Sequence, residues 1–213
     1  MRILQVISSV DPRGGGPIEG LKQQSTMLEQ LGHDVEVVTC DDSEASFVKS
    51  FPLQVHAMGP PKLTYAFTQR LYPWLIANAP DFDAVIVNGL WQHHSFATYR
   101  AMKRLERPYV VFPHGMLSSY FRRTAPLKHF KKLLYWFWGE YRVLAGAAAV
   151  LFTTEDERDS ARGSFKFYRA KERVVGYGTT GPVGDACFQA SMFRREYPKV
   201  GESPFFLFLG RIH

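Results

Sequence analysis

The chain has 213 residues, of which 46% are hydrophobic and 22% are charged. That composition is typical of a globular protein and excludes a disordered or low-complexity chain. The formal net charge is +6, and its main source lies between Arg100 and Arg142, where ten basic residues stand against only Glu106 and Glu140. A surface of this charge favours phosphates, anionic lipid or nucleic acid as partners.

The two cysteines, Cys40 and Cys187, lie far apart and outside any CxxC motif. The sequence therefore predicts neither a disulfide framework nor a zinc cluster, and a reducing, cytoplasmic compartment is expected. The N-terminal stretch MRILQVISSV holds an apolar run of about five residues, which is shorter than a signal-peptide core. No apolar run approaches the ~18 residues that span a bilayer, so no transmembrane helix is predicted.

Short β-branched runs alternate along the chain with longer segments of helical periodicity. Ile3–Ile7 is apolar nearly throughout, which is typical of a strand buried on both faces of a parallel sheet. After the glycine-rich turn at residues 13–17, apolar positions predict a helix that ends at Gly32. The remaining expected elements are strands at Val35–Thr39, Val55–Met58, Ala84–Val87, Tyr109–Phe112, Ala148–Phe152 and Arg173–Val175, and helices at Tyr65–Ala79, His93–Leu105, Pro126–Ala145 and Glu155–Gly163. The alternation predicts an α/β fold, a Rossmann-like doubly wound parallel sheet with helices on both faces.

The composition changes near the C-terminal end. Residues 1–197 are expected to form the Rossmann-like domain, and the turn-rich residues 198–204 are typical of a linker. A new hydrophobic strand, Phe205–Leu209, follows. Because nothing after it would cover this strand, we expect residues 205–213 to begin a second domain, with the strand either paired elsewhere or disordered.

The first strand-to-helix turn, Arg13-Gly14-Gly15-Gly16-Pro17, is the first candidate site. Ligands of an open parallel sheet bind outside the carboxyl ends of its strands, where a helix N-terminus presents free amides to anions. The dinucleotide fingerprint GxGxxG is matched only in part, because Glu19 occupies its third glycine position. The turn favours contact with a phosphate or a sugar; a turn required only by chain geometry is the alternative.

A histidine follows the strand that ends at Phe112. His114 is expected to project from the carboxyl edge of the sheet into the crevice, where an imidazole can donate a hydrogen bond or position a hydroxyl. A purely structural histidine is the alternative. Trp91, His93 and His94 occupy the same edge after the neighbouring strand. Adjacent histidines at a helix start point in different directions, so no metal site is predicted.

The basic, aromatic segment 120–142 has two readings. Its apolar residues recur at helical spacing, which is typical of an amphipathic helix packed on the sheet with a solvated basic side. The alternative is an interfacial surface that contacts an anionic membrane or a lipid-linked phosphate acceptor. Nucleic acid is not expected, because no recognition motif is present.

Three common catalytic or nucleotide-binding motifs are absent from the sequence: the serine-nucleophile motif GxSxG, the P-loop GxxxxGK[ST] and the metalloprotease motif HExxH.

Taken in order, these motifs resemble the N-terminal domain of a GT-B glycosyltransferase of family 4, a group of retaining, nucleotide-sugar-dependent enzymes. The resemblance covers essentially the whole chain. It is carried by Gly14–Gly16, by DAVIVNGLW at residues 83–91, by PHGML at 113–117, by TTE at 153–155, by GYG at 176–178 and by FLFLGR at 206–211. It implies a two-domain enzyme whose N-terminal domain binds the acceptor and whose C-terminal domain binds the nucleotide sugar.

The resemblance also implies roles for individual residues. Gly15, Gly16 and Arg211 would lie near the donor diphosphate, where a guanidinium can neutralise the charge of the leaving group. His114 is the catalytic candidate, close to the transferred sugar. The remaining residues expected to line the acceptor cleft are Glu19, Trp91, His93, His94, Gly115, Met116 and Glu155.

Two positions depart from the family pattern, since Asn88 stands where many relatives have histidine and residues 176–178 replace a Pro-Asn-Gly. The paired donor-site glutamates of the family belong to the C-terminal domain, so the fragment alone is expected to be inactive. No cofactor and no metal are expected, because the nucleotide sugar is a substrate. The alternatives are a non-catalytic nucleotide- or phosphate-binding Rossmann module and an NAD-type oxidoreductase domain, the latter disfavoured by Glu19.

Overall fold

The computed structural model describes residues 1–118, 126–176, 184–201 and 204–206. Its internal contacts divide the chain into two units, residues 1–178 and residues 179–213. The candidate site lies in the first unit.

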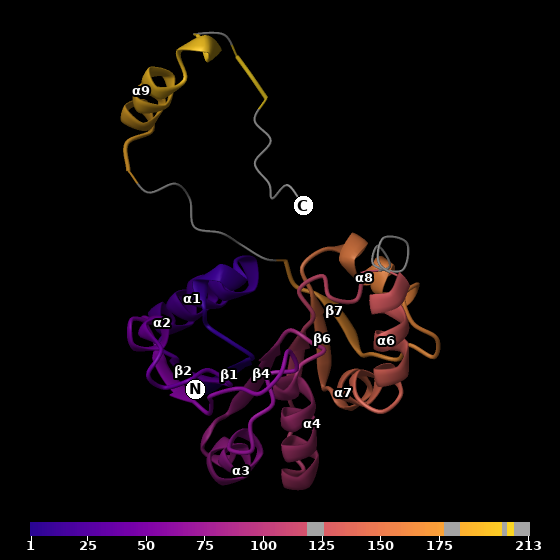
Figure 1. Ribbon diagram of the computed structural model, residues 1–213. Coiled ribbons are helices and arrows are strands. Elements are labelled where there is room, and N and C mark those ends of the chain that lie inside the picture. Colours follow the sequence, from indigo (N-terminus) through magenta and orange to yellow (C-terminus); the bar gives the residue numbers. More distant parts are fainter. Residues whose placement is uncertain (119–125, 177–183, 202–203, 207–213) are drawn as a thin grey trace. The chain divides into compact units, whose positions relative to one another are not determined.

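The first unit is built on a seven-stranded sheet in the order β3-β2-β1-β4-β5-β6-β7, with every pair parallel (Figure 1). The predicted Rossmann-like fold is confirmed. The order runs outward in both directions from the neighbours β1 and β4, which makes their carboxyl ends the topological switch point where ligands bind in such sheets. The strands are β1 (Arg2–Ile7), β2 (Asp34–Thr39), β3 (Gln54–Ala57), β4 (Ala84–Asn88), β5 (Val110–Phe112), β6 (Ala149–Phe152) and β7 (Glu172–Val174).

Helices cover both faces of this sheet because the side chains of a strand alternate between the two faces. Leu4 and Val6 of β1 pack with residues of α3, α4, α6 and α7, whereas Ile7 packs with Ile18 and Leu21 of α1 on the other side. Both clusters are shielded from water. The helices of this unit are α1 (Gly16–Gln30), α2 (Ser46–Lys49), α3 (Leu71–Asn78), α4 (His93–Leu105), α6 (Pro126–Trp136), α7 (Glu140–Gly146) and α8 (Glu155–Arg162).

The helix expected at Pro126–Ala145 is two helices, α6 and α7, that meet at Gly139. A Cβ atom at Gly139 would lie 2.4 Å from Cζ of Tyr135, so the tyrosine ring occupies the space that a side chain would need. A side chain at this position would displace the Tyr135 ring, and the φ of −113° and ψ of −90° of Gly139 redirect the chain. Helical periodicity continues through the break, which explains why the sequence pattern did not reveal it.

The helix expected at Tyr65–Ala79 begins only at Leu71. The preceding residues are tied to the chain before them, because Lys62 and Phe67 form an isolated β-bridge and the Thr68 hydroxyl donates to the Met58 carbonyl. Ala66 adopts a φ of 55°, which a helix cannot accommodate. Tertiary hydrogen bonds therefore override the helical pattern here.

The second unit contains α9 (Ala186–Glu196), which the sequence analysis did not predict. The carboxylate of Asp185 caps it by accepting a hydrogen bond of 2.6 Å from the Phe188 amide, and the ring of Phe193 stacks on Phe205 at 5.7 Å. Residues 205 and 206 are not in a strand, and the rest of the expected strand, with Arg211, lies outside the described residues. The predicted domain boundaries, with a first domain of residues 1–197, a linker of residues 198–204 and a second domain from residue 205, stay a prediction.

Among the described helices, none has the length and hydropathy needed to span a bilayer.

Candidate functional site

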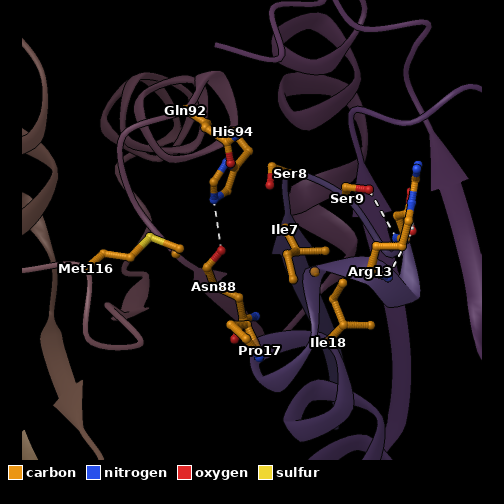
Figure 2. A pocket seen from close by; sticks show the side chains of 13 residues that line it. Ile7, Ser8, Ser9, Arg13, Pro17, Ile18, Asn88, Gln92, His94 and Met116 are labelled. Carbon is orange, nitrogen blue, oxygen red and sulfur yellow. Dashed lines mark hydrogen bonds and ion pairs between the residues drawn. The ribbon is translucent and has the colours of Figure 1, made fainter. Parts of the chain in front are cut away.

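A cavity of about 500 Å³ opens at the carboxyl ends of β1 and β4, at the switch point of the sheet (Figure 2). Its walls come from the β1–α1 turn, the β4–α4 turn and the segment after β5. The lining residues are Ile7, Ser8, Ser9, Asp11, Arg13, Gly14, Pro17, Ile18, Asn88, Gly89, Gln92, His94 and Met116. Hydroxyl, amide and imidazole groups alternate there with apolar side chains, a mixture that suits a small polar ligand with apolar faces.

The two charged side chains in the cavity wall neutralise each other. Asp11 caps the turn by accepting from the Arg13 amide at 2.9 Å, and its carboxylate also accepts from Nε of the Arg13 side chain at 3.0 Å. The hydrogen bonds from Arg13 lower the pKa of Asp11. Because the pair is internally balanced, the cavity presents hydrogen-bonding groups and no net charge to a ligand.

The glycines of the β1–α1 turn are required for its shape. Gly15 has a φ of 71° and a ψ of −129°, a conformation essentially confined to glycine, and a Cβ at Gly14 would lie 2.5 Å from Cδ1 of Ile18. Gly16 begins α1, and the amides of Ile18 and Glu19 in its first turn donate to the Gly15 carbonyl at 3.1 and 3.2 Å. Gly14 lines the cavity, whereas Gly15 and Gly16 lie next to it at the helix start. Their expected contact with a diphosphate stays a prediction.

A chain of side-chain hydrogen bonds crosses the sheet and ends at His114. Nε2 of Gln5 donates to Oε1 of Gln24 at 3.2 Å, and Nδ2 of Asn88 donates to Oε1 of Gln5 at 2.7 Å. The Asn88 oxygen therefore faces Nε2 of His114, at 3.1 Å. An amide oxygen can only accept, so His114 carries its proton on Nε2 and has its lone pair on Nδ1. Gln5 and Asn88 are almost fully buried, and neither Gln5 nor this chain of bonds was predicted.

His114 is held in an uncommon backbone conformation beside this chain. Its φ is 50° and the φ of Gly115 is 73°, so the turn after β5 is tight, and the imidazole stacks on Phe112 at 5.7 Å. Burial lowers the pKa of His114 to about 4, although the carboxylate of Glu157 opposes this shift. The imidazole is therefore neutral near pH 7. A neutral histidine of known tautomer can position a substrate hydroxyl.

Glu157 of α8 fixes the turn that carries His114. Its Oε1 accepts from the Gly115 amide at 2.7 Å, and its Oε2 accepts from the Thr153 amide at 2.8 Å and from the Thr153 hydroxyl at 2.7 Å. The carboxylate thus joins the segments that follow β5 and β6. Glu155, the acid chosen from the sequence, is exposed and lies 3.7 Å from Arg158. Helical phase explains the difference, because positions two residues apart point to different sides of a helix.

Thr154 caps α8 through its hydroxyl, which accepts from the Glu157 amide at 3.1 Å. We predict that Thr154→Ala lowers the free energy of unfolding by about 1 kcal/mol, because an exposed first-turn amide loses its partner. Urea unfolding curves of the two proteins measure the difference. Thr154→Ser keeps the oxygen and should stay within a few tenths of a kcal/mol of the wild type; equal losses in both variants would contradict the capping role.

His94 lines the cavity but is fully buried. Its Nε2 lies 2.9 Å from the carbonyl oxygen of Asn88, so this nitrogen carries the proton (Figure 2). Burial lowers the pKa of His94 to about 4. Met116 lies nearby, and its sulfur accepts a hydrogen bond from the Leu90 amide at 3.1 Å. Through its hydrogen bond to the Asn88 carbonyl, His94 holds the β4–α4 turn against the end of β4.

Trp91 and His93 do not line the cavity. The Trp91 indole nitrogen donates to the Met116 carbonyl at 3.0 Å, and its ring packs on Phe165 at 5.1 Å. The ring of His93 lies 4.7 Å from that of Phe67. Glu19 is exposed on α1 and accepts from Gln23. Of the residues expected in the cleft, the structure brings His94 and Met116 into the cavity wall and His114 beside it.

A buried acid beside this edge was not predicted. Glu140, at the start of α7, is fully buried, and its Oε1 accepts from the Trp91 amide at 2.7 Å and from the Ser95 hydroxyl at 2.9 Å. Burial raises the pKa of Glu140 to about 7, against the opposing effect of these hydrogen bonds and of Lys132. The sequence did contain a signal for this buried acid, because Glu140 stands between the apolar residues 133–138 and Val143–Leu144.

The segment 120–142 is only partly described, because residues 119–125 lie outside the described ranges. Phe130 and Leu134 of α6 are exposed, as is Trp138, whereas Trp136 is fully buried and stacks on Phe165 at 4.5 Å. The helix therefore packs one side on the core and presents apolar side chains to solvent. Within the described ranges, no three His, Cys, Asp or Glu side chains come together as metal ligands.

The family model described as "Glycosyl transferase 4-like domain" matches residues 15–178. No curated protein matches the chain. Among solved structures, HepE of Anabaena in complex with UDP-glucose is similar at a TM-score of 0.60 with 15% identity over 94% of this chain and 50% of that chain. MurG of Acinetobacter baumannii has a TM-score of 0.50 with 11% identity over 96% of this chain and 55% of that chain.

The MnaA–UDP structure from S. aureus has a TM-score of 0.54, with 15% identity over 90% of this chain and 51% of that chain. The chain spans about half the length of these structures. At such identities the likeness concerns the fold, and it confirms the expected class, the N-terminal half of a GT-B architecture.

Proposed function

Because the chain belongs to the family of glycosyl transferase 4-like domains, we propose that it is the acceptor-binding domain of a retaining glycosyltransferase. The whole enzyme transfers a sugar from a nucleotide-sugar donor to a polysaccharide, a glycolipid or another glycoconjugate. It works in the cytoplasm, in part at the inner face of the membrane, and it needs no metal or other cofactor. Residues 1–213 alone do not turn over, because the donor site belongs to the C-terminal half.

One observation carries the proposal. The cavity at the switch point is charge-balanced and lined by hydroxyl, amide and imidazole groups, which is the chemistry that binds sugar hydroxyls. The bound UDP-glucose of HepE and the bound UDP of MnaA support a nucleotide sugar as the donor. A phosphate at the cavity itself would meet no uncompensated cation among the described lining residues, so we place the diphosphate outside the cavity, beside Gly15 and Gly16. Arg211, which the resemblance assigns to the same diphosphate, lies outside the described residues.

The roles of the residues follow from two needs of the transfer reaction, the orientation of the transferred sugar and the stabilisation of the negative charge on the departing diphosphate. His114, neutral and with its Nε2 proton engaged by Asn88, orients a hydroxyl of the transferred sugar. The amide at the start of α1 and the guanidinium of Arg211 stabilise the negative charge that develops on the departing diphosphate. Asn88 holds His114 in place and also lines the cavity, whereas Gln5 and Glu157 act from outside the cavity wall, through Asn88 and through the Gly115 amide.

A phosphate-binding module without catalysis is the second candidate. The glycine-rich turn and the start of α1 beside the cavity favour it, because a glycine-rich loop that leads into a helix N-terminus binds anions in proteins of many functions. It differs from the enzyme in one observable, the turnover of a donor. An oxidoreductase is disfavoured, because Glu19 occupies the third glycine position of the fingerprint.

The test is a donor-hydrolysis and transfer assay on the full-length gene product with UDP-, GDP- and ADP-sugars. We expect one nucleotide class to be turned over at least tenfold faster than the others, with and without EDTA. Residues 1–213 expressed alone should show no turnover. A full-length protein that binds these donors but turns over none of them would move the assignment to the binding module.

A further inference from the structure

A second concave surface lies at the other end of α4 from the cavity. One hollow, of about 430 Å³, lies between the C-terminal half of α4, the segment that leads into β5, and α7. A second, of about 460 Å³, lies along the exposed side of α4. The two hollows share four lining residues, Tyr99, Lys103, Glu106 and Arg142. Together they form one surface, which is called the α4–α7 groove.

The groove is strongly basic. It is lined by five cationic side chains and a single carboxylate: Arg100, Lys103, Arg104, Arg107, Arg142 and Glu106. Within the part of the chain that the structure describes, none of the five cations forms an ion pair, although ten such pairs occur elsewhere on it. Lys103 and Arg142 line both hollows, and five positive charges gathered along two adjoining hollows attract an anion more strongly than dispersed cations do.

The dipole of α4 accounts for only part of this cluster. Cations in the last turn of a helix are stabilised by its partial negative charge, and Lys103 and Arg104 lie in that turn. Arg100 lies before it, Arg107 follows the helix, and Arg142 belongs to α7. The Arg107 guanidinium donates to the carbonyls of residues 80 and 82, which orients it without removing its charge.

Aromatic rings supply the walls between these cations. Tyr99, Tyr109 and Tyr141 line the first hollow. The Lys103 ammonium lies 5.9 Å from the centre of the Tyr99 ring, and the Arg142 guanidinium lies 6.0 Å from that of Trp138, which is exposed. Guanidinium groups bind phosphate oxygens in pairs, and ring faces accommodate an adjoining apolar or planar group.

The groove is separate from the cavity. His94, in the first turn of α4, lines the cavity, whereas the groove residues 103–107 lie at the end of the helix. A rise of about 1.5 Å per residue puts roughly 15 Å between the two ends. A sugar held in the cavity therefore does not fill the groove.

We propose that the α4–α7 groove is a second ligand site, which binds the phosphate of a molecule that also carries an apolar or planar group. Two sources share this chemistry, a soluble phosphate ester and the headgroup of an anionic phospholipid. Arg104 and Arg142 pair with phosphate oxygens, because Arg107 already donates to two backbone carbonyls and the Arg100 guanidinium lies 4.8 Å from the centre of the Tyr72 ring. The tyrosine rings contact the remainder of the ligand. The site is independent of the proposed transfer reaction, since it uses none of the residues that line the cavity.

The test uses Lys103→Gln/Arg142→Gln in the full-length protein, because these two cations line both hollows and are exposed. One arm titrates phenyl phosphate, a monophosphate ester that carries a planar group, by calorimetry. The other measures sedimentation with vesicles of phosphatidylcholine containing 30% phosphatidylglycerol. In whichever arm the wild type binds, the double variant should bind at least about tenfold more weakly, the loss expected for charge-assisted hydrogen bonds. Binding should also weaken with added salt.

The matched control is Lys171→Gln/Arg173→Gln, which removes the same charge from exposed positions outside the groove. It should bind like the wild type in both arms. Binding of phenyl phosphate identifies a soluble phosphate ester, and binding of the charged vesicles alone identifies a lipid headgroup. Absence of binding in both arms, or an equal loss in both double variants, overturns the site. Because neither arm measures sugar transfer, failure of the proposed function leaves this test intact.

Discussion

His114→Ala should lower kcat of the full-length enzyme by about 10²-fold or more while leaving its fold intact. The imidazole lies beside the cavity, neutral near pH 7 and with its tautomer set by Asn88. Positioning groups that act in the transition state contribute effects of this order. The measurement is donor turnover at saturating substrate, with circular dichroism and urea unfolding to confirm that the variant is folded.

Two further variants sharpen this prediction. His33→Ala removes a histidine that precedes β2, at the amino edge of the sheet, and should leave kcat unchanged. Asn88→Ala removes the acceptor of the Nε2 proton and should give an intermediate loss, because the imidazole stays but is no longer oriented. Full turnover in His114→Ala would remove the catalytic assignment and leave the family and the fold untouched.

Much of the fold could be predicted from the sequence because its central strands β1, β2 and β4 are short, mostly apolar and largely buried. The predicted strands Ala84–Val87 and Tyr109–Phe112 differ from β4 and β5 by one residue at one end. The order of the strands follows the rule for crossovers in such sheets. The break at Gly139 could not be predicted, because it depends on a ring from the preceding turn filling the space beside the glycine.

The site could be predicted only in outline. Motifs after β1, β4 and β5 pointed to the correct edge of the sheet, since the carboxyl ends of parallel strands share an edge. Which of the adjacent pair His93 and His94 faces the cavity depends on helical phase, and the same holds for Glu155 and Glu157. The role of Gln5 could not be predicted, because a polar residue inside an apolar strand gives no sign of its hydrogen-bond partners. Only the fold brings Gln5 to Asn88, and Asn88 to His114.

The unfolding free energy should fall steeply when the pH drops from 6.5 toward 4, because two imidazoles are buried in the neutral form. Burial lowers the pKa of His94 and of His114 from 6.5 to about 4. Below pH 6.5 the unfolded chain binds these protons first, so the stability present above that pH is lost as the pH falls. A shift of this size corresponds to about 3 kcal/mol for each imidazole.

Glu140 acts in the opposite direction. Burial raises its pKa from 4.5 to about 7, so the folded state holds this proton more tightly than the unfolded chain does. Its contribution is fully present below pH 4.5 and is lost as the pH rises through 7. Each imidazole loses about 2 kcal/mol between pH 6.5 and 4.5 and Glu140 returns about 2 kcal/mol, so the net loss in this window should be about 2 kcal/mol. Stability should therefore be highest near pH 6.5 to 7.

His94→Gln isolates one of the two histidines. The amide nitrogen of glutamine can replace Nε2 as donor to the Asn88 carbonyl but does not titrate, so the variant should lose about 3 kcal/mol less than the wild type between pH 7 and pH 4. Urea unfolding followed by the four tryptophans, all within residues 1–178, measures this difference. His33→Gln is the matched control and should keep the wild-type profile. Equal losses in the wild type and in His94→Gln would contradict burial of a neutral imidazole as the cause.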